Sequence, residues 1–288
     1  MSMEVNSHTL ALAENLIASL IDAARYDPYL EAVHPGSRSH ADGWGYVYVS
    51  IARSRELNFG TVSFYKRCKP IFEELSRIEL HKLINILESY IRIDMVVHAR
   101  AASKGEPVCD IHAHPYKETY NGITVYLAHN GGVDKKKLAQ DLGVDLSAHT
   151  DSALLTKFLA KELGECISNE DDIDSCVCRA YRRALEKYAI PCRGVVTALI
   201  ILYRDASRMY VTSYVPNCCL DEEKDRARLT YYTPYVGRTH GLTFMISPTA
   251  IDIYFKQLVA SSTLMEIRRS LNELISLDPH GIKVIDRL

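Results

Sequence analysis

The chain has 288 residues, of which 47% are hydrophobic and 24% charged, and its formal net charge is −2. Acidic and basic residues are spread along the chain, which leaves no basic surface for nucleic acid or for an anionic membrane. The most apolar run, at 195–203, is less than half of the roughly 20 residues that a membrane-spanning helix needs. The first residues show no signal-peptide pattern. We therefore expect a cytoplasmic protein with no nucleic-acid partner and no membrane partner.

The first half of the chain mixes apolar stripes of helical period with short apolar runs typical of strands. We predict helices at 9–25 and 70–89, a loop at 27–42, and strands at 45–52, 58–66, 93–99 and 122–130, with the charged segment 53–57 as the turn between the first two strands.

In the second half, Asp134 and Gly143 are the expected N-terminal and C-terminal caps of a short helix. We predict further helices at 151–163, 172–189 and within 262–277, and consecutive strands at 194–203, 208–215, 229–235 and 242–247. Strands in runs, with helices in pairs between them, indicate an α+β layered architecture rather than a βαβ alternation. No internal repeat or low-complexity linker divides the chain, so we expect residues 1–288 to be a single domain.

The eight cysteines show no zinc-knuckle spacing, because Cys176 with Cys178 and Cys218 with Cys219 are too close together for paired ligation. Reduced thiols are the default in the cytoplasm, and we expect them here. One or two disulfides are a possible exception, since some intracellular proteins of hyperthermophiles carry them.

The segment YLAHNGGV ends an apolar strand pattern in Asn130, Gly131 and Gly132. Adjacent glycines are unfavourable within a strand, because each adds backbone freedom that folding must remove. A plain turn is one interpretation, since Asn-Gly and Gly-Gly are common turn dipeptides. The other is that the backbone N–H groups and the Asn130 amide face a negatively charged group.

Two charged residues follow or begin apolar elements. Arg100 alternates with His98 along a strand, so both side chains point the same way, and a buried arginine needs a carboxylate from the protein or from a substrate. Asp151 stands in the first turn of a predicted helix, where it either compensates the helix dipole or accepts a substrate ammonium group. Together with an oxyanion corner at Asn130 and Gly131, they would form a receptor for an α-amino acid.

The motifs DGWG, HAR followed by A, S and G, HAHP, HNGGV and DSALL occur in this order along the chain. As an ordered set they resemble the class II glutamine amidotransferase domain, an N-terminal-nucleophile hydrolase, and in particular its stand-alone members. By motif the resemblance covers about residues 9–165. It implies a four-layer αββα sandwich of two antiparallel sheets and no cofactor.

The resemblance also implies roles for the residues that match the family motifs. Arg100 would hold the carboxylate of glutamine, and Asp151 would hold its α-amino group. Ser103 stands where the family has a threonine or serine that lines the same pocket. The implied substrate-binding residues are Arg100, Ser103, Asp151 and His98, and the implied oxyanion hole consists of Asn130 and Gly131.

The sequence departs from the family pattern at its start. The family's nucleophile is a cysteine exposed by removal of the initiator methionine, and its own α-amine is the base, whereas this chain begins with Met1 and Ser2 and has its first cysteine at Cys68. Three explanations stay open: Ser2 is the catalytic nucleophile, the true N-terminus differs, or the protein is a pseudoenzyme. Because the first residues are polar, we expect them to form an edge strand or a loose segment, with weak or absent turnover.

A metal site is a further hypothesis, since His98, Cys109, His112 and His114 are close in sequence and His-Ala-His is a known ligand spacing. The resemblance accounts for His98 and His114 as structural residues, which leaves too few ligands. His112 also replaces the asparagine that the family usually has at that position. We expect no metal site.

The leading hypothesis is a glutamine amidotransferase-like protein that binds, and by acyl transfer hydrolyses, the side-chain amide of glutamine or a γ-glutamyl compound. The alternative is a catalytically inactive pseudo-amidotransferase that acts as a binding or assembly subunit. No synthase domain follows the motifs, so an ammonia acceptor would be a partner subunit. A homo-oligomer is possible.

Overall fold

The computed structural model describes residues 1–53, 58–167, 172–204, 206–216, 223–257 and 265–288. Its paired strands all run antiparallel within these ranges, and they form one sheet of seven strands and one of six. In the described part of the chain, no helix is both long enough and apolar enough to cross a membrane.

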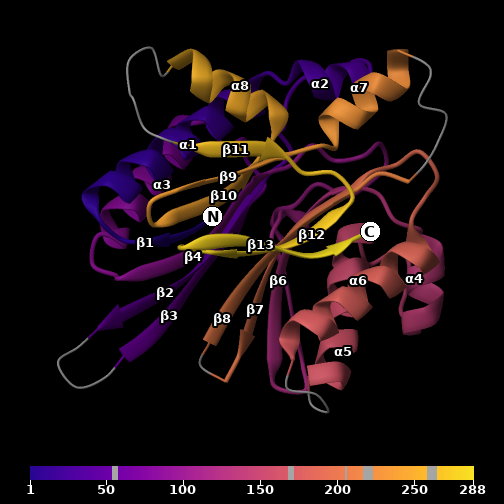
Figure 1. Cartoon of the computed structure of the whole chain (residues 1–288). Coiled ribbons are helices and arrows are strands. Elements are labelled where there is room, and N and C mark those ends of the chain that lie inside the picture. Colours follow the sequence, from indigo (N-terminus) through magenta and orange to yellow (C-terminus); the bar gives the residue numbers. More distant parts are fainter. Residues whose placement is uncertain (54–57, 168–171, 205, 217–222, 258–264) are drawn as a thin grey trace.

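The seven-stranded sheet has the N-terminal strand near its middle (Figure 1). In spatial order its strands are β11 (Glu266–Arg269), β9 (Tyr235–Thr239), β10 (Leu242–Ile246), β1 (Ser2–Glu4), β4 (Arg92–Ala99), β2 (Trp44–Arg53) and β3 (Asn58–Arg67).

The six-stranded sheet contains the strand that ends in the Asn130–Gly131 corner. In spatial order its strands are β13 (Gly281–Arg287), β12 (Glu273–Asp278), β8 (Ala206–Tyr214), β7 (Val195–Tyr203), β6 (Ile123–Gly131) and β5 (Tyr116–Tyr120).

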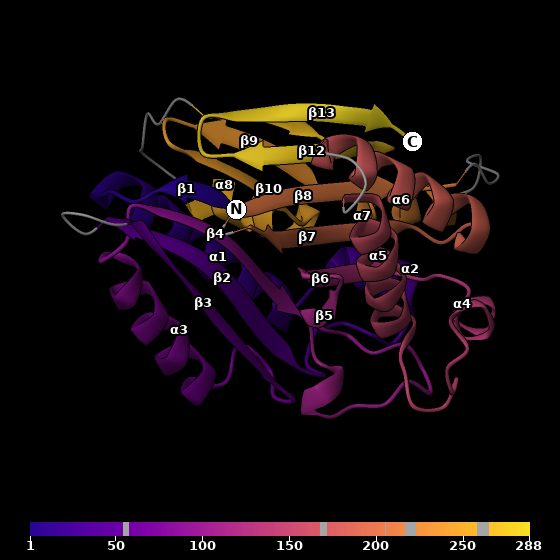
Figure 2. The same ribbon diagram turned by 90° about the horizontal axis from the view of Figure 1, so that it is seen from below.

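Helices cover the outer face of each sheet, as the two perpendicular views show (Figures 1 and 2). On the seven-stranded sheet these are α1 (Ser7–Arg25), α3 (Glu74–Leu87) and α8 (Pro248–Gln257), and on the six-stranded sheet α4 (Lys135–Leu142), α5 (Asp151–Ile167) and α6 (Ile173–Tyr188). Two more helices, α2 (Pro28–Val33) and α7 (Glu223–Tyr231), pack against each other, and a short 3-10 helix spans Asp110–His112.

Three apolar clusters correspond to the three interfaces between these layers. One joins α1, α3 and α8 to the seven-stranded sheet, and another joins α4, α5 and α6 to the six-stranded sheet. The third lies between the sheets, where Val47 and Val96 meet Tyr126, Ile200 and Val211. The expected four-layer αββα sandwich is therefore confirmed.

Most of the predicted elements are present. The caps of α4 are as expected, since the Asp134 side chain accepts a hydrogen bond from the Lys137 N–H and Gly143 has a φ of 65°. The turn predicted at 53–57 lies almost wholly outside the described residues. The loop predicted at 27–42 is wrong in part, because Asp27 caps α2.

Two elements of the C-terminal half were predicted wrongly. Residues 229–234 are not a strand, because α7 continues to Tyr231 and packs its end against α2; only the last residue of the predicted strand, Tyr235, is in one, as the first residue of β9. The helix predicted within 262–277 is replaced by β11 and β12. Strand β12 buries Leu274 toward the helices and Ile275 toward the other sheet, and apolar residues on both faces of a strand imitate a helical stripe.

The disulfide between Cys166 and Cys176 corrects the expectation of reduced thiols for this pair. It joins the last turn of α5 to the first turn of α6, which are close neighbours in the helical layer. Cys68, Cys109, Cys178 and Cys192 are free thiols.

The N-terminal strand corrects another expectation, because it is neither loose nor at an edge. Strand β1 pairs with β4 on one side and with β10 on the other. Its polar Ser2 is fully buried, and the Ser2 hydroxyl donates a hydrogen bond to the Asp94 carboxylate. Across the sheet interface, the Ser207 hydroxyl of β8 donates to the same carboxylate. A buried acceptor therefore compensates for the polarity of this strand.

We expect Asp94→Ala to lower the free energy of unfolding by about 3 kcal/mol, because the buried Ser2 hydroxyl and the partly buried Ser207 hydroxyl lose their acceptor. The matched control is Asp278→Ala. Arg92 forms an ion pair with both carboxylates, at 3.5 Å with Asp94 and at 3.1 Å with Asp278. The Asp278 side chain is 42% exposed, so its loss should cost less than about 1 kcal/mol. Urea unfolding of both variants measures the difference, and equal losses would contradict the bridging role of Asp94.

Candidate functional site

A cavity of about 840 Å³ opens where the ends of β4 and β6 approach α5. Six of the seven residues singled out from the sequence line it: His98, Arg100, Ser103, Asn130, Gly131 and Asp151. The seventh, Ser2, does not line it. The six lining residues are brought together by strands that are distant in sequence. The roles assigned to them in binding stay predictions.

Arg100 is positioned by the backbone of the DGWG segment. Its N–H donates to the Gly43 carbonyl at 2.8 Å, and its own carbonyl accepts from the Asp42 N–H at 2.9 Å. The Asp42 carboxylate in turn accepts from the Ala102 N–H at 2.8 Å. The guanidinium is buried and donates through Nη1 to the Pro107 carbonyl at 3.0 Å. These backbone hydrogen bonds fix the position of Arg100 at the end of β4. Most of the five N–H donors of its guanidinium group are still available to a ligand.

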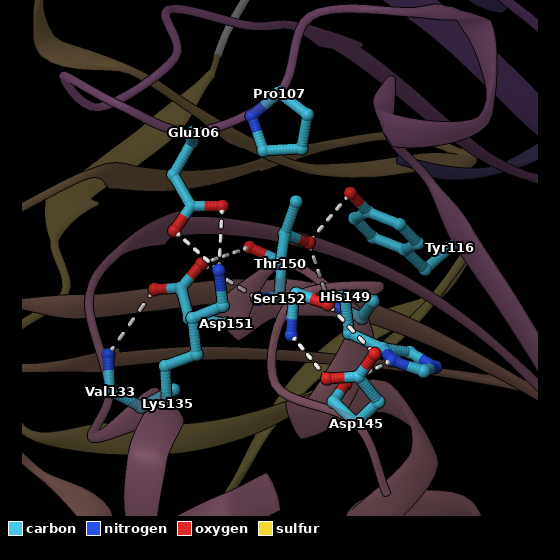
Figure 3. Close-up of polar contacts among 12 residues, drawn as sticks. Glu106, Pro107, Tyr116, Val133, Lys135, Asp145, His149, Thr150, Asp151 and Ser152 are labelled. Atoms are coloured by element: carbon cyan, nitrogen blue, oxygen red, sulfur yellow. Dashed lines mark hydrogen bonds and ion pairs between the residues drawn. The ribbon is translucent and has the colours of Figure 1, made fainter.

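Asp151 is the first residue of α5, and its carboxylate accepts hydrogen bonds from backbone N–H groups (Figure 3). Oδ1 accepts from the Ser152 N–H at 2.7 Å, and Oδ2 accepts from the Val133 N–H at 3.4 Å. Close by, the Lys135 ammonium forms an ion pair with Glu106 at 2.9 Å. Within the described residues, neither Arg100 nor Asp151 forms an ion pair. Each charged group is therefore available for an ion pair with a ligand.

The Asn130–Gly131 corner can be built only with glycine at its second position. Gly131 has a φ of 128°, and a Cβ there would lie 1.8 Å from the Gly194 carbonyl oxygen. Asn130 Oδ1 accepts a hydrogen bond of 3.3 Å from the Tyr231 hydroxyl. Burial raises the pKa of Tyr231, which keeps this hydroxyl protonated as a donor. The Asn130 amide nitrogen is therefore the group left for a ligand.

Three neutral histidines form one wall of the cavity. Burial lowers the pKa of His98 to about 3, and burial also lowers the pKa of His114 and of His129. The rings of His98 and His114 meet edge-on with centroids 4.4 Å apart. His129 Nδ1 lies 2.9 Å from the Ser152 hydroxyl, whereas both ring nitrogens of His114 are buried without a partner. The wall therefore carries no charge at neutral pH.

The histidines do not form a metal centre with their neighbours. Among the residues that the structure describes, no group of three or more histidine, cysteine, aspartate or glutamate side chains could hold a metal ion. His98 and His114 line the cavity, but Cys109 and His112 do not.

Ser2 lies beside the cavity, and its hydroxyl is directed to Asp94. Met1 lines the cavity instead, and its ammonium group donates to the Met95 carbonyl at 2.7 Å. Burial lowers the pKa of this ammonium group to about 5, although the Asp94 carboxylate acts in the opposite direction. In the chain as it stands, the α-amine beside the cavity therefore belongs to Met1.

An acid–histidine pair in the cavity wall, made of the buried Asp27 and the partly buried His40, was not predicted from the sequence. Asp27 Oδ2 lies 3.0 Å from His40 Nε2, and Asp27 Oδ1 accepts from the Thr249 hydroxyl and from the Tyr29 N–H. Burial raises the pKa of Asp27, but these hydrogen bonds outweigh it and hold the pKa below its usual value. The Asp-Pro dipeptide at 27–28 could have indicated the helix cap, but nothing local indicates its place in the cavity.

No family model and no curated protein matches the sequence. Several solved structures are similar to the chain, among them the following two. One, the "allosteric regulatory enzyme of purine biosynthesis", is 14% identical over 93% of this chain and 46% of its own, with a TM-score of 0.47. The other, a "predicted glutamine amidotransferase from Pseudomonas aeruginosa PA01", is 11% identical over 86% of this chain and 90% of its own, with a TM-score of 0.37. The chain spans about half the length of the first, and likenesses this weak carry no argument about function.

We expect Gly131→Ala to lower the free energy of unfolding by at least about 3 kcal/mol, because the new methyl group would overlap the Gly194 carbonyl. The matched control is Gly122→Ala. Gly122 also has a positive φ, of 77°, but a Cβ there would have no atom within 4 Å. Its replacement should therefore cost only about 1–2 kcal/mol of backbone strain. Thermal unfolding compares the two variants, and equal losses would show that the Gly131 corner has room for a side chain.

The buried histidines predict a loss of stability in acid. Because the native pKa of His98, about 3, lies below the unfolded value of about 6.5, only the unfolded chain takes up this proton between these pH values. The stabilisation is complete above pH 6.5 and is lost as the pH falls. Between these pH values, each such histidine should lower the free energy of unfolding by about 1 kcal/mol for each unit by which the pH falls.

Urea midpoints at pH 7, 6 and 5 measure this slope. We expect His114→Phe, which keeps the ring packing, to be less sensitive to acid than the wild type. The control is His8→Gln on the exposed side of α1, which should keep the wild-type slope. A His114→Phe variant with the wild-type slope would show that His114 is not a source of the acid sensitivity.

Proposed function

We propose that the chain is a glutamine amidotransferase-like protein whose cavity binds glutamine or a γ-glutamyl compound by its α-amino-acid end. In this proposal Arg100 binds the carboxylate and Asp151 binds the ammonium group. Asn130 and Gly131 hold the side-chain carbonyl, and His98 and Ser103 complete the walls.

The observation that carries the proposal is that two opposite charges line one cavity without pairing with each other. A buried arginine without a carboxylate is unfavourable unless a ligand supplies one. An α-amino acid supplies a carboxylate for Arg100 and an ammonium group for Asp151 at the same time. The uncharged histidine wall favours a ligand whose remaining polar group is neutral, as a side-chain amide is.

Hydrolysis of the bound amide is the second candidate function. Ser2 would be the nucleophile once Met1 is removed, and the Asn130 amide with the Gly131 N–H would stabilise the oxyanion. The Ser2 hydroxyl would first have to leave the Asp94 carboxylate, to which it donates. For this reason we favour a binding protein with weak or absent turnover in the chain as it stands.

We expect Arg100→Gln and Asp151→Asn each to weaken glutamine binding at least 30-fold, about 2 kcal/mol, because each leaves one charged end of the ligand without a partner. Isothermal titration calorimetry measures this. The control is Lys104→Gln, an exposed cavity residue outside the receptor, which should leave the affinity unchanged.

A matched ligand separates the two charged residues. Glutaramate has the carboxylate and amide of glutamine but no α-amino group, so Asp151→Asn should not weaken its binding, whereas Arg100→Gln should. If Arg100→Gln bound glutamine as tightly as the wild type, the amino-acid receptor would be wrong.

Ammonia release from glutamine tests the second candidate. We expect no turnover above background while Met1 is retained, as checked by intact mass, and no change in Ser2→Ala. Turnover that arises when Met1 is removed and disappears in Ser2→Ala would identify Ser2 as the nucleophile and would overturn our preference for a binding protein.

A further inference from the structure

A second arginine lines the cavity beside the Asn130–Gly131 corner. Arg193 belongs to the turn between α6 and β7, where its N–H donates to the Ile190 carbonyl at 3.1 Å. Its side chain is exposed, and among the described residues it forms no ion pair and no side-chain hydrogen bond. The positive charge of Arg193 is therefore available to a ligand.

The Arg193 side chain packs against the corner because position 132 has no side chain. A Cβ at Gly132 would lie 3.0 Å from both Cδ and Nη1 of Arg193, so even an alanine would crowd the guanidinium group. The backbone beside it is also fixed, since the Gly132 N–H donates to the Gly194 carbonyl at 3.1 Å. The guanidinium group therefore lies over Gly132, one residue from Gly131 of the corner.

Arg193 is also close to the acidic residue of the amino-acid receptor. Burial raises the pKa of Tyr232, while the positive charge of Arg193 lowers it and the negative charge of Asp151 raises it, so both charges lie near this ring. The Val133 N–H, next to Gly132, donates to Asp151 Oδ2 at 3.4 Å. Arg193 and Asp151 therefore lie near the same ligand site without being paired with each other.

The charges of the cavity wall do not cancel within the protein. The Asp27 carboxylate interacts with His40, and Glu106 pairs with Lys135 at 2.9 Å (Figure 3). Among the described arginine, lysine, aspartate and glutamate side chains that line the cavity, those without an ion pair are Arg100, Lys104, Asp151 and Arg193. Glutamine has one carboxylate and one ammonium group, so it leaves an excess of positive charge. A ligand with a second carboxylate matches this wall better.

The position of Arg193 indicates where the second carboxylate belongs on the ligand. In the proposed binding mode the side-chain carbonyl is held by Asn130 and Gly131, so the amide nitrogen also lies at the corner. A carboxylate carbon two bonds from this nitrogen is about 2.5 Å away from it, and the Cα atoms of Gly131 and Gly132 are about 3.8 Å apart. An α-amino acid joined through its nitrogen therefore reaches the guanidinium group without a spacer. Arginine binds a carboxylate well, through two parallel N–H donors.

We infer that the ligand of this cavity is a γ-glutamyl amino acid, with the glutamyl end bound at Arg100 and Asp151 and the second carboxylate bound by Arg193. This inference rests on the proposed function, because the amino-acid receptor sets the orientation of the ligand. It narrows the ligand class from glutamine and γ-glutamyl compounds in general to γ-glutamyl derivatives of α-amino acids.

The experiment compares glutamine, γ-glutamylglycine and γ-glutamylglycinamide by isothermal titration calorimetry on the full chain. The two glycine compounds differ only in the second carboxylate, which the glycinamide replaces with a neutral amide. Because Arg193 is exposed, solvent weakens its ion pair. We therefore expect γ-glutamylglycine to bind about fivefold more tightly than the glycinamide.

Arg193→Gln tests whether this arginine binds the second carboxylate. It should reduce the ratio of the two affinities to about one, because the ion pair is lost. It should also keep glutamine affinity within about twofold of the wild type, because glutamine has no second carboxylate. The control is Lys104→Gln, which removes another exposed cation of the cavity wall and should keep the wild-type ratio.

The possible failures are distinguishable. If glutamine binds but the two glycine compounds bind equally well, the inference is overturned and the proposed function stands. If the wild type binds none of the three compounds, the proposed function fails and the inference fails with it. If Arg193→Gln weakens glutamine as much as γ-glutamylglycine, Arg193 belongs to the amino-acid receptor and the inference is overturned. An equal fall of the ratio in Lys104→Gln would show general electrostatic attraction instead of a bound carboxylate and would also overturn it.

Discussion

The structure depends on one buried carboxylate that joins three strands. Asp94 of β4 accepts hydrogen bonds from Ser2 of β1 in its own sheet and from Ser207 of β8 in the facing sheet. A fully buried carboxylate is stable only when its oxygens are satisfied, so these hydroxyl groups must stay in place. The same contact puts the start of the chain in the middle of a sheet and turns Ser2 away from the cavity. Asp94 therefore stabilises the fold and also determines the orientation of Ser2, the candidate nucleophile.

The layered fold was predictable where burial falls on one face or where a strand is apolar throughout. Strands β4 and β6 and helix α4 follow from local pattern and capping alone. Strand β1 did not, because its polar residues are compensated by Asp94, which is distant in sequence. The end of α7 and strand β12 were also missed, since tertiary packing overrides the strand propensity of tyrosine and hides the period of a strand buried on both faces.

The candidate site was predictable to a similar extent. Arg100, Asn130, Gly131 and Asp151 stand at the ends of strong apolar patterns, where an isolated charge or glycine calls for an explanation. The wall contributed by α1, and the Asp27–His40 pair, could not be predicted, because a leucine stripe on a helix indicates a core whether or not the core contains a cavity. Only the stacking of layers brings residues of α1 into the wall of the same cavity as Arg100 and Asp151.

The corner of the site also constrains how the sequence can diverge. A side chain at Gly131 would meet the Gly194 carbonyl, and a side chain at Gly194 would meet the Tyr232 ring at 2.2 Å. Positions 131, 194 and 232 therefore pack against one another with no room for a larger side chain. They lie on β6, just before β7 and just after α7. An alanine at Gly131 would overlap a backbone carbonyl, which no substitution at position 194 removes, whereas an alanine at Gly194 would overlap a side chain, which a smaller residue at position 232 would relieve. In related chains we therefore expect glycine to persist at position 131, and positions 194 and 232 to change together.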